Sequence, residues 1–416
     1  MTTQNTERLH ALDAIRGGAL LLGIIVHMSM SFWPIPLWPI RDNDPSSVLL
    51  TSFGVIHIFR MSLFFVIAGF FARLLLEKRG ARGFAADRAK RIAIPLLVGW
   101  PLLFAAFIAV IVWSAIRAGT WEAMQAQPQP ALSLSTIPLL HTWFLYVLLW
   151  LYVAALAVVG LVRLVDREGR IVAAADRFVR AIVTTQLAPI VLGLPLFAVF
   201  AFAESWIPWG GIRTPDVGLV PNLAACVGFA TAFGFGWLLH RQIDLLSVWR
   251  RWWPAYLAAA AALTLVCLSY FAATPAATAE MGLTDRLWSS AVYPLATWTW
   301  SLGLIGLATA CLTKENRTIR YLADSSYWVY LIHLPVAMVF QVLFANVAWP
   351  WFVKFPLMLA IAMALMLLSY QLLVRNTFIG AVLNGKRIPG KIRALRAESS
   401  AAAPAKNVSA VGLESP

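Results

Sequence analysis

The sequence predicts an all-α, polytopic membrane protein of about ten transmembrane helices, with both termini in the cytoplasm. Three observations lead to this fold class: an apolar composition, a series of long apolar runs, and an alternating distribution of Lys and Arg. Hydrophobic residues make up 60% of the 416 residues, and charged residues only 12%, about half the share of an average soluble domain. So few charges cannot cover a water-soluble surface, whereas lipid accepts apolar side chains.

The apolar runs follow one another along most of the chain. Each holds roughly the 20 mainly apolar residues that a transmembrane helix needs. The runs are 12–33, 52–76, 92–113, 139–163, 182–203, 219–240, 254–273, 287–312, 325–347 and 350–374. We therefore expect one membrane domain over 1–375. The polar, Ala- and Ser-rich segment 376–416 is expected to be a cytoplasmic tail that is partly disordered.

Lys and Arg gather in every second connection between these runs. The alternate connections carry only Arg41, Arg117, Arg213 and Arg286, one each. The positive-inside rule makes the Lys- and Arg-rich connections cytoplasmic, and both termini with them. Because the basic residues follow membrane topology, the net charge of +14 does not indicate a nucleic-acid partner. The three cysteines lie inside apolar runs, so we expect neither disulfides nor a cysteine metal site.

Ionisable side chains inside spans are costly and mark candidate sites. In the first run, Arg16 and His27 are eleven residues apart, which places both on one helix face, roughly 16 Å apart along the axis. Asp13 lies one turn before Arg16, within reach of an ion pair. The alternative is an interfacial Asp–Arg pair together with a hydrogen-bonded core histidine.

The second run opens with His57 and Arg60, one turn apart and near the outer edge. Together they suggest the wall of a polar pocket, although Arg60 alone could also extend toward the interface. At the cytoplasmic end, Arg88 and Arg91 are again one turn apart. This pair has the geometry of a phosphate clamp, and topology alone is the other explanation.

Two further histidines lie in later runs. His141 opens the fourth run from the outside, and His333 lies within the ninth, as a structural or pocket-lining residue. No HExxH, CxxC, Walker or GxGxxG pattern occurs, so the sequence predicts neither a metal site nor a nucleotide-hydrolysis site.

Four segments in order resemble the membrane acyltransferase 3 family. Arg16 and His27 match its R-x10-H pattern, and the run from Phe64 to Phe70 is similar to its FFxxSGF segment, with Ala68 in place of the usual Ser. Arg88 and Arg91 match its basic motif, and the stretch from Tyr327 to Pro335 is similar to its YxxYLxH segment.

The resemblance implies a multi-pass acyltransferase of the bacterial inner membrane with no permanently bound cofactor. Within the family, the chain is most similar to members that transfer succinyl groups from succinyl-CoA to osmoregulated periplasmic glucans, and glucan-synthesis proteins are then possible partners. The alternatives are an O-acetyltransferase that uses acetyl-CoA to modify lipopolysaccharide, peptidoglycan or exopolysaccharide, and a secondary transporter or flippase.

The resemblance also suggests a role for each candidate residue. His27, with Asp13 and Arg16, is expected to be catalytic, as general base or as nucleophile. Arg88, Arg91 and Arg16 would hold the phosphates of acyl-CoA. The remaining candidates would bind the substrate: His57, Arg60, His141 and His333. We further expect the outer tryptophans Trp33, Trp206 and Trp209 to stack on sugar rings.

Overall fold

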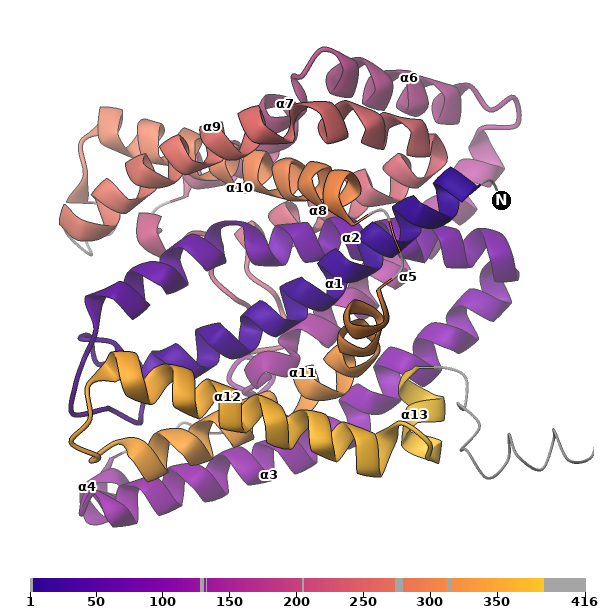
Figure 1. Ribbon diagram of the computed structural model, residues 1–416. Coiled ribbons are helices and arrows are strands. Elements are labelled where there is room, and N and C mark those ends of the chain that lie inside the picture. The colour runs from indigo at the N-terminus through magenta and orange to yellow at the C-terminus, as the bar shows by residue number, and fades with distance from the viewer. Residues whose placement is uncertain are drawn as a thin grey trace, which may run out of the picture.

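The computed structural model shows a bundle of long helices, most of which run between the same two ends (Figure 1). The structure describes residues 3–127, 131, 133–203, 206–273, 280–312, 314 and 316–384. Within these residues, β-type pairing is limited to an isolated bridge between Pro138 and Val217. The predicted all-α class is confirmed.

Long helices form the body of the bundle. They are α1 Thr3–Ser29, α2 Ser47–Arg88, α3 Ile94–Arg117, α5 Trp143–Val165, α8 Leu223–Leu239, α9 Leu246–Ala273, α10 Leu283–Cys311, α11 Arg317–Phe344 and α12 Trp351–Ser369. The shorter helices are α4 Trp121–Ala126, α6 Arg170–Thr184, α7 Ala188–Phe202 and α13 Phe378–Leu383. Single π-helical turns follow α2 (Ala89–Ala93) and α12 (Tyr370–Val374).

In the described part of the chain, seven helical stretches are long and apolar enough to cross a membrane, and the bent pair α6–α7 makes an eighth. Two of these stretches, Ser47–Arg117 and Leu223–Tyr270, each overlap two of the predicted apolar runs. Every predicted run therefore overlaps a described helix, and the chain is a multi-pass membrane protein. The count of ten spans and the cytoplasmic side of the termini stay predictions.

One predicted span has a different form. The run 182–203 is not a single helix, because the chain bends by 110° between α6 and α7. Gln186 at the bend has a positive φ of 62°. The 15 residues of α7 extend about 22 Å, which is less than the hydrocarbon core of about 30 Å.

The two ends of the bundle carry different short helices and chain ends. The start of α1 and the short helix α13 lie at the same end, on the right in Figure 1, and α4 lies at the opposite end. The predicted tail 376–416 is described only as far as residue 384, so its remaining part lies outside the described residues.

Close helix packing positions α2, which carries Arg60 and Arg88. A side chain at Gly69 of α2 would collide with the carbonyl oxygen of Phe233 in α8, and one at Gly236 of α8 would collide with that of Val66 in α2. Small residues at such crossings let transmembrane backbones approach each other. The two glycines therefore hold α2 firmly against α8.

A buried ion pair fixes the loop between α1 and α2. The side chain of Lys354 in α12 is fully buried and contacts the carboxylate of Asp42 in this loop. Its Nζ also donates to Asn43 Oδ1 at 2.7 Å and to the Val347 carbonyl at 3.1 Å. Burial raises the pKa of Asp42 from its ordinary value, while the Lys354 contact opposes that shift. The loop that follows His27 is thus anchored to α12.

Candidate functional site

A small cavity lies between α1, α2, α5 and α11, at the level where the intramembrane histidines meet. We call it the inner cavity. Its volume is about 30 Å³, and its polar lining residues are His27, Arg60, His141, Tyr330 and His333. Four residues that the sequence predicted for the site therefore converge from four different segments of the chain. The cavity is far below the roughly 300–1,000 Å³ that holds a small-molecule ligand, so a substrate enters only if its walls move apart.

His333 lies between the other two histidines of the inner cavity. Its ring centroid is 5.1 Å from that of His27 and 4.9 Å from that of His141. The packing of α1 against α11 supports this contact, because Gln341 Nε2 donates to the His27 carbonyl oxygen at 2.8 Å. Among the described residues, no group of three or more His, Cys, Asp and Glu has a geometry suited to a metal ion.

Backbone carbonyls select the tautomers of two of these rings. His333 Nδ1 lies 2.5 Å from the Tyr330 carbonyl oxygen, and His141 Nε2 lies 2.9 Å from that of Leu331. A carbonyl only accepts, so these nitrogens carry the protons. The opposite nitrogens, His333 Nε2 and His141 Nδ1, are buried without a hydrogen-bond partner among the described residues, as is His27 Nδ1. His141 Nδ1 and His333 Nε2 are therefore unprotonated nitrogens that can accept a hydrogen bond or a proton.

Arg60 supplies the positive charge of the inner cavity. Its Nε is buried without a hydrogen-bond partner, and the guanidinium forms no ion pair with the described residues. It lies against α1 at Gly23, where an added Cβ would be 2.6 Å from Arg60 Nη1. A cation held inside a membrane protein without a counter-ion is suited to an anionic or polarised oxygen of a ligand.

His57 precedes Arg60 by one turn of α2, on the side of this cavity away from the basic pocket, and does not line it. Its Nε2 lies 3.2 Å from the Ile212 carbonyl oxygen, and its ring stacks on Phe53 at 5.1 Å. Trp33 and Trp206 are buried and pack on Phe53 and Phe200. Neither tryptophan offers a free face for sugar stacking, which corrects that expectation, and the side chain of Trp209 lies outside the described residues.

A larger cavity of about 210 Å³ lies toward the end of the bundle that carries α13. We call it the basic pocket. Its polar lining residues are Arg16, Arg88, Arg91, Tyr152, Asp324, Ser326, Tyr327 and Asn384. The three arginines that the sequence predicted as a phosphate clamp thus face one pocket, although they come from α1, the end of α2 and the following π turn.

Asp87 orients the two neighbouring arginines. Its side chain is only 3% exposed, and its carboxylate lies 2.5 Å from Arg88 Nη2 and 3.3 Å from Arg91 Nε. Arg79 Nη1 is also 2.8 Å from it. Arg88 Nη1 further donates to Tyr152 Oη at 3.5 Å. Three guanidinium groups against the one carboxylate of Asp87 leave this cluster positive. Arg16 and Asp324 add one cation and one anion to the pocket lining, so the pocket stays positive, as an anion site requires.

Asp13 lies outside both cavities. It forms an ion pair with Arg16 at 3.1 Å, in which both side chains are about two-fifths exposed. It faces a separate polar cavity together with His10, Lys314 and Asn316. Because α1 is continuous, Asp13 is fourteen residues and about 21 Å from His27. Asp13 therefore pairs with Arg16 and does not lie beside the histidines of the inner cavity.

The basic pocket and the inner cavity adjoin each other. Leu20, Phe64 and Phe144 line both of them. The ring centroids of Phe64 and Phe144 are 4.4 Å apart in an edge-to-face contact. These three apolar side chains are therefore the partition between a positive pocket and a cluster of imidazoles.

Two site residues escaped the sequence analysis. Asp87 resembled one more charge in a basic loop, and only its burial shows that it organises the arginines. Tyr152 stood in an apolar run, where a tyrosine is most often an interfacial residue. Asp87 and Arg91 are four residues apart, which is ion-pair spacing on a helix and could have pointed to Asp87. No spacing signal points to Tyr152.

The chain was compared with known proteins. Residues 9–371 match the acyltransferase 3 family, which is described as an acyltransferase domain. Curated relatives include glucans biosynthesis protein C of Escherichia coli strain SMS-3-5, which is 32% identical over 142 residues. The same protein of E. coli O1:K1 and of strain E24377A is 31% identical over 142 residues. Each alignment covers 34% of this chain and 36% of the relative. No solved structure was found to match.

The family match spans almost all of the described membrane region, including α1, α2, α5 and α11, whose side chains build the two cavities. The chain therefore belongs to the acyltransferase 3 family.

Proposed function

We propose that the protein transfers an acyl group, with succinyl as the first candidate, from cytoplasmic acyl-CoA to hydroxyl groups of an extracytoplasmic glucan. The observation that carries this proposal is the adjacency of the basic pocket and the inner cavity through Leu20, Phe64 and Phe144. The glucan acceptor is supported by relatives that are named glucans biosynthesis protein C. A bacterial inner membrane and glucan-synthesis partner proteins follow from the same assignment.

The basic pocket suits the donor. Phosphates of acyl-CoA would pair with Arg88 and Arg91, whose planar forks bind phosphate oxygens through two hydrogen bonds, and with Arg16. The acyl-thioester end would pass the partition when the three apolar side chains separate. It would then reach the inner cavity, where water is scarce and electrostatic contacts are strong.

The chemistry would take place beside His27. In one route, His27 takes the proton of a sugar hydroxyl while the sugar oxygen bonds to the thioester carbonyl carbon. Arg60 stabilises the resulting oxyanion. The carbon–sulfur bond then breaks, and the thiolate of CoA takes the proton back from the imidazolium. In the other route, a ring nitrogen of His27 bonds to the thioester carbonyl carbon, the carbon–sulfur bond breaks, and the CoA thiolate leaves with the ring N–H proton. The sugar oxygen then bonds to the acyl carbon, the carbon–nitrogen bond breaks, and the released imidazole takes the hydroxyl proton. His141 and His333 would accept hydrogen bonds from other hydroxyl groups of the incoming sugar.

Donor and acceptor are tested together by mass spectrometry of periplasmic glucans from cells with and without the gene. A mass gain of one succinyl group per modified glucose in cells that have the gene supports the proposal. A gain of one acetyl group instead identifies acetyl-CoA as the donor. Unmodified glucans, together with acylated lipopolysaccharide or peptidoglycan, would overturn the glucan assignment.

A further inference from the structure

A fourth cavity lies between α5, α6 and α8, apart from the site described above. We call it the apolar groove. Its volume of about 530 Å³ lies within the usual range of ligand cavities, about 300–1,000 Å³. Its apolar lining includes Val158 and Val159 of α5, Ile171 of α6, and Phe233 and Trp237 of α8. Phe233 also packs against Tyr152, with 5.8 Å between ring centroids, and so separates the groove from the basic pocket.

Three arginines stand at the rim of this groove: Arg73, Arg163 and Arg241. Arg73 Nε donates to Glu77 at 2.7 Å. Arg241 holds Asp176 through two hydrogen bonds of 2.8 Å each. Arg163 is exposed and forms no ion pair with the described residues. Three cations against two carboxylates leave the rim with a net positive charge.

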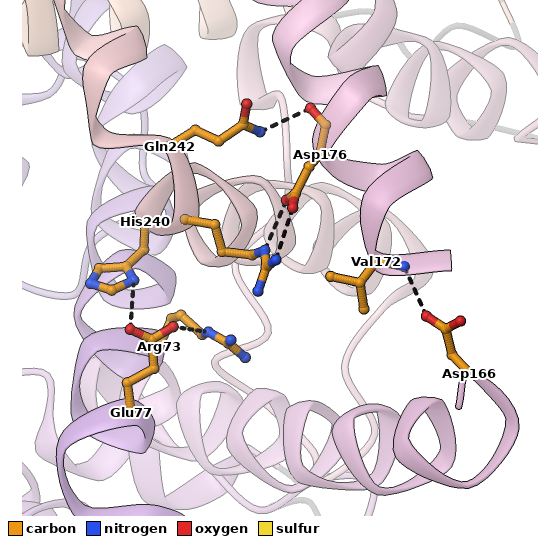
Figure 2. A network of polar contacts seen from close by, with 8 residues as sticks. Arg73, Glu77, Asp166, Val172, Asp176, His240 and Gln242 are labelled. Atoms are coloured by element: carbon orange, nitrogen blue, oxygen red, sulfur yellow. Dashed lines mark hydrogen bonds and ion pairs between the residues drawn. The ribbon is translucent and has the colours of Figure 1, made fainter. Parts of the chain in front are cut away.

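Contacts of α6 with its neighbours fix this helix beside the groove, and Figure 2 shows several of them. Asp166 Oδ2 accepts from the Val172 amide at 3.0 Å at the start of α6. Gln242 Nε2 donates to the Asp176 carbonyl oxygen at 2.9 Å in its middle. Further along, Arg180 pairs with Asp244 at 2.9 Å. Because α6 is fixed at three places along its length, the apolar groove is a preformed cavity.

We propose that the apolar groove binds an anionic glycerophospholipid. One acyl chain fills the apolar walls, and the phosphate lies at the rim against Arg163, with Arg73 and Arg241 beside it. Charge complementarity supports this occupant, because a positive rim above an apolar cavity matches an anionic headgroup above a hydrocarbon chain. The positive-inside pattern predicts this rim on the cytoplasmic leaflet, where anionic lipids accumulate and juxtamembrane basic side chains bind them. This proposal does not depend on acyl transfer.

The test compares lipid retention by the purified full-length chain, measured by native mass spectrometry after incubation with phosphatidylglycerol or phosphatidylcholine. We expect one tightly retained phosphatidylglycerol per chain and at least fivefold less phosphatidylcholine. Gly234 of α8 lines the groove, and a Cβ added there would have no atom within 4 Å. The side chain of Gly234→Trp can therefore fill the groove without a clash at its Cβ. It should abolish retention. Gly160→Trp is the matched control, since its Cβ is equally unobstructed and it does not line the groove.

The headgroup is tested separately. Arg163→Gln should remove the preference for phosphatidylglycerol but leave phosphatidylcholine retention unchanged, whereas Arg167→Gln, an equal loss of charge outside the groove, should change neither. Glycerol phosphate without acyl chains should not compete. Equal retention of both lipids by the wild-type chain, or retention by Gly234→Trp equal to that of Gly160→Trp, would overturn the proposal. A dimer that Gly234→Trp dissociates would assign the groove to a second copy instead.

Discussion

Replacing Gly23 by Ala should displace Arg60 without damaging the fold. The added Cβ would lie 2.6 Å from Arg60 Nη1, whereas carbon atoms in ordinary contact are about 3.5 Å apart or more. The guanidinium must therefore retreat by about 1 Å. Nη1 is the end of a flexible side chain, so the movement itself is cheap, and Ala is favoured over Gly in a helix by roughly 1 kcal/mol.

The cost of Gly23→Ala should fall on catalysis. A misplacement of about 1 Å in an active site can lower the rate roughly 100-fold, and we expect a loss of about 10- to 100-fold in kcat/KM. The assay measures transfer of a radiolabelled acyl group in membrane vesicles. Gly18→Ala is the control, because Gly18 lies on the same helix with no atom within 4 Å of its added Cβ. Equal activity of the two variants at equal expression would refute the role of Arg60.

Three further variants test other parts of the account. The double variant Arg88→Lys, Arg91→Lys keeps positive charge beside Asp87 but loses both forks, so the KM for acyl-CoA should rise about tenfold or more, while Arg82→Gln with Lys90→Gln leaves it unchanged. His333→Asn keeps a donor for the Tyr330 carbonyl but removes the Nε2 acceptor, and kcat should fall about tenfold; an unchanged kcat would exclude His333 from the reaction. Lys354→Met strands the buried carboxylate of Asp42, which should cost roughly 3–5 kcal/mol of stability; thermal unfolding in detergent measures this loss, and adding Asp42→Asn should recover part of it.

Much of the candidate site follows from helix periodicity. The spacing of Arg16 and His27 predicts a shared face on one helix, and α1 carries both residues on continuous helix as expected. Arg88 and Arg91, one turn apart, also face the same pocket. These relations are local, so a single repeat of 3.6 residues per turn is enough to predict them.

The rest depends on how the helices pack. The contact of His27 with His333 joins positions 306 residues apart, and it arises from the packing of α1 on α11, which no spacing reveals. A bend between α6 and α7 stands where the sequence predicts one span. Gln186 at this bend has a positive φ, which the residue type Gln does not predict. Burial turns Asp87 from one charge among many into the residue that orients the arginines.

We propose that acyl transfer takes place at His27, in the inner cavity, which the partition of Leu20, Phe64 and Phe144 separates from the basic pocket. The most direct measurement is the transfer of a radiolabelled acyl group from acyl-CoA to periplasmic glucan by membranes that contain His27→Gln, compared with wild type at equal expression. We predict a loss of at least 100-fold, as for removal of a general base, with affinity for acyl-CoA unchanged because Arg16, Arg88 and Arg91 remain. Full activity of His27→Gln at normal expression would contradict the account.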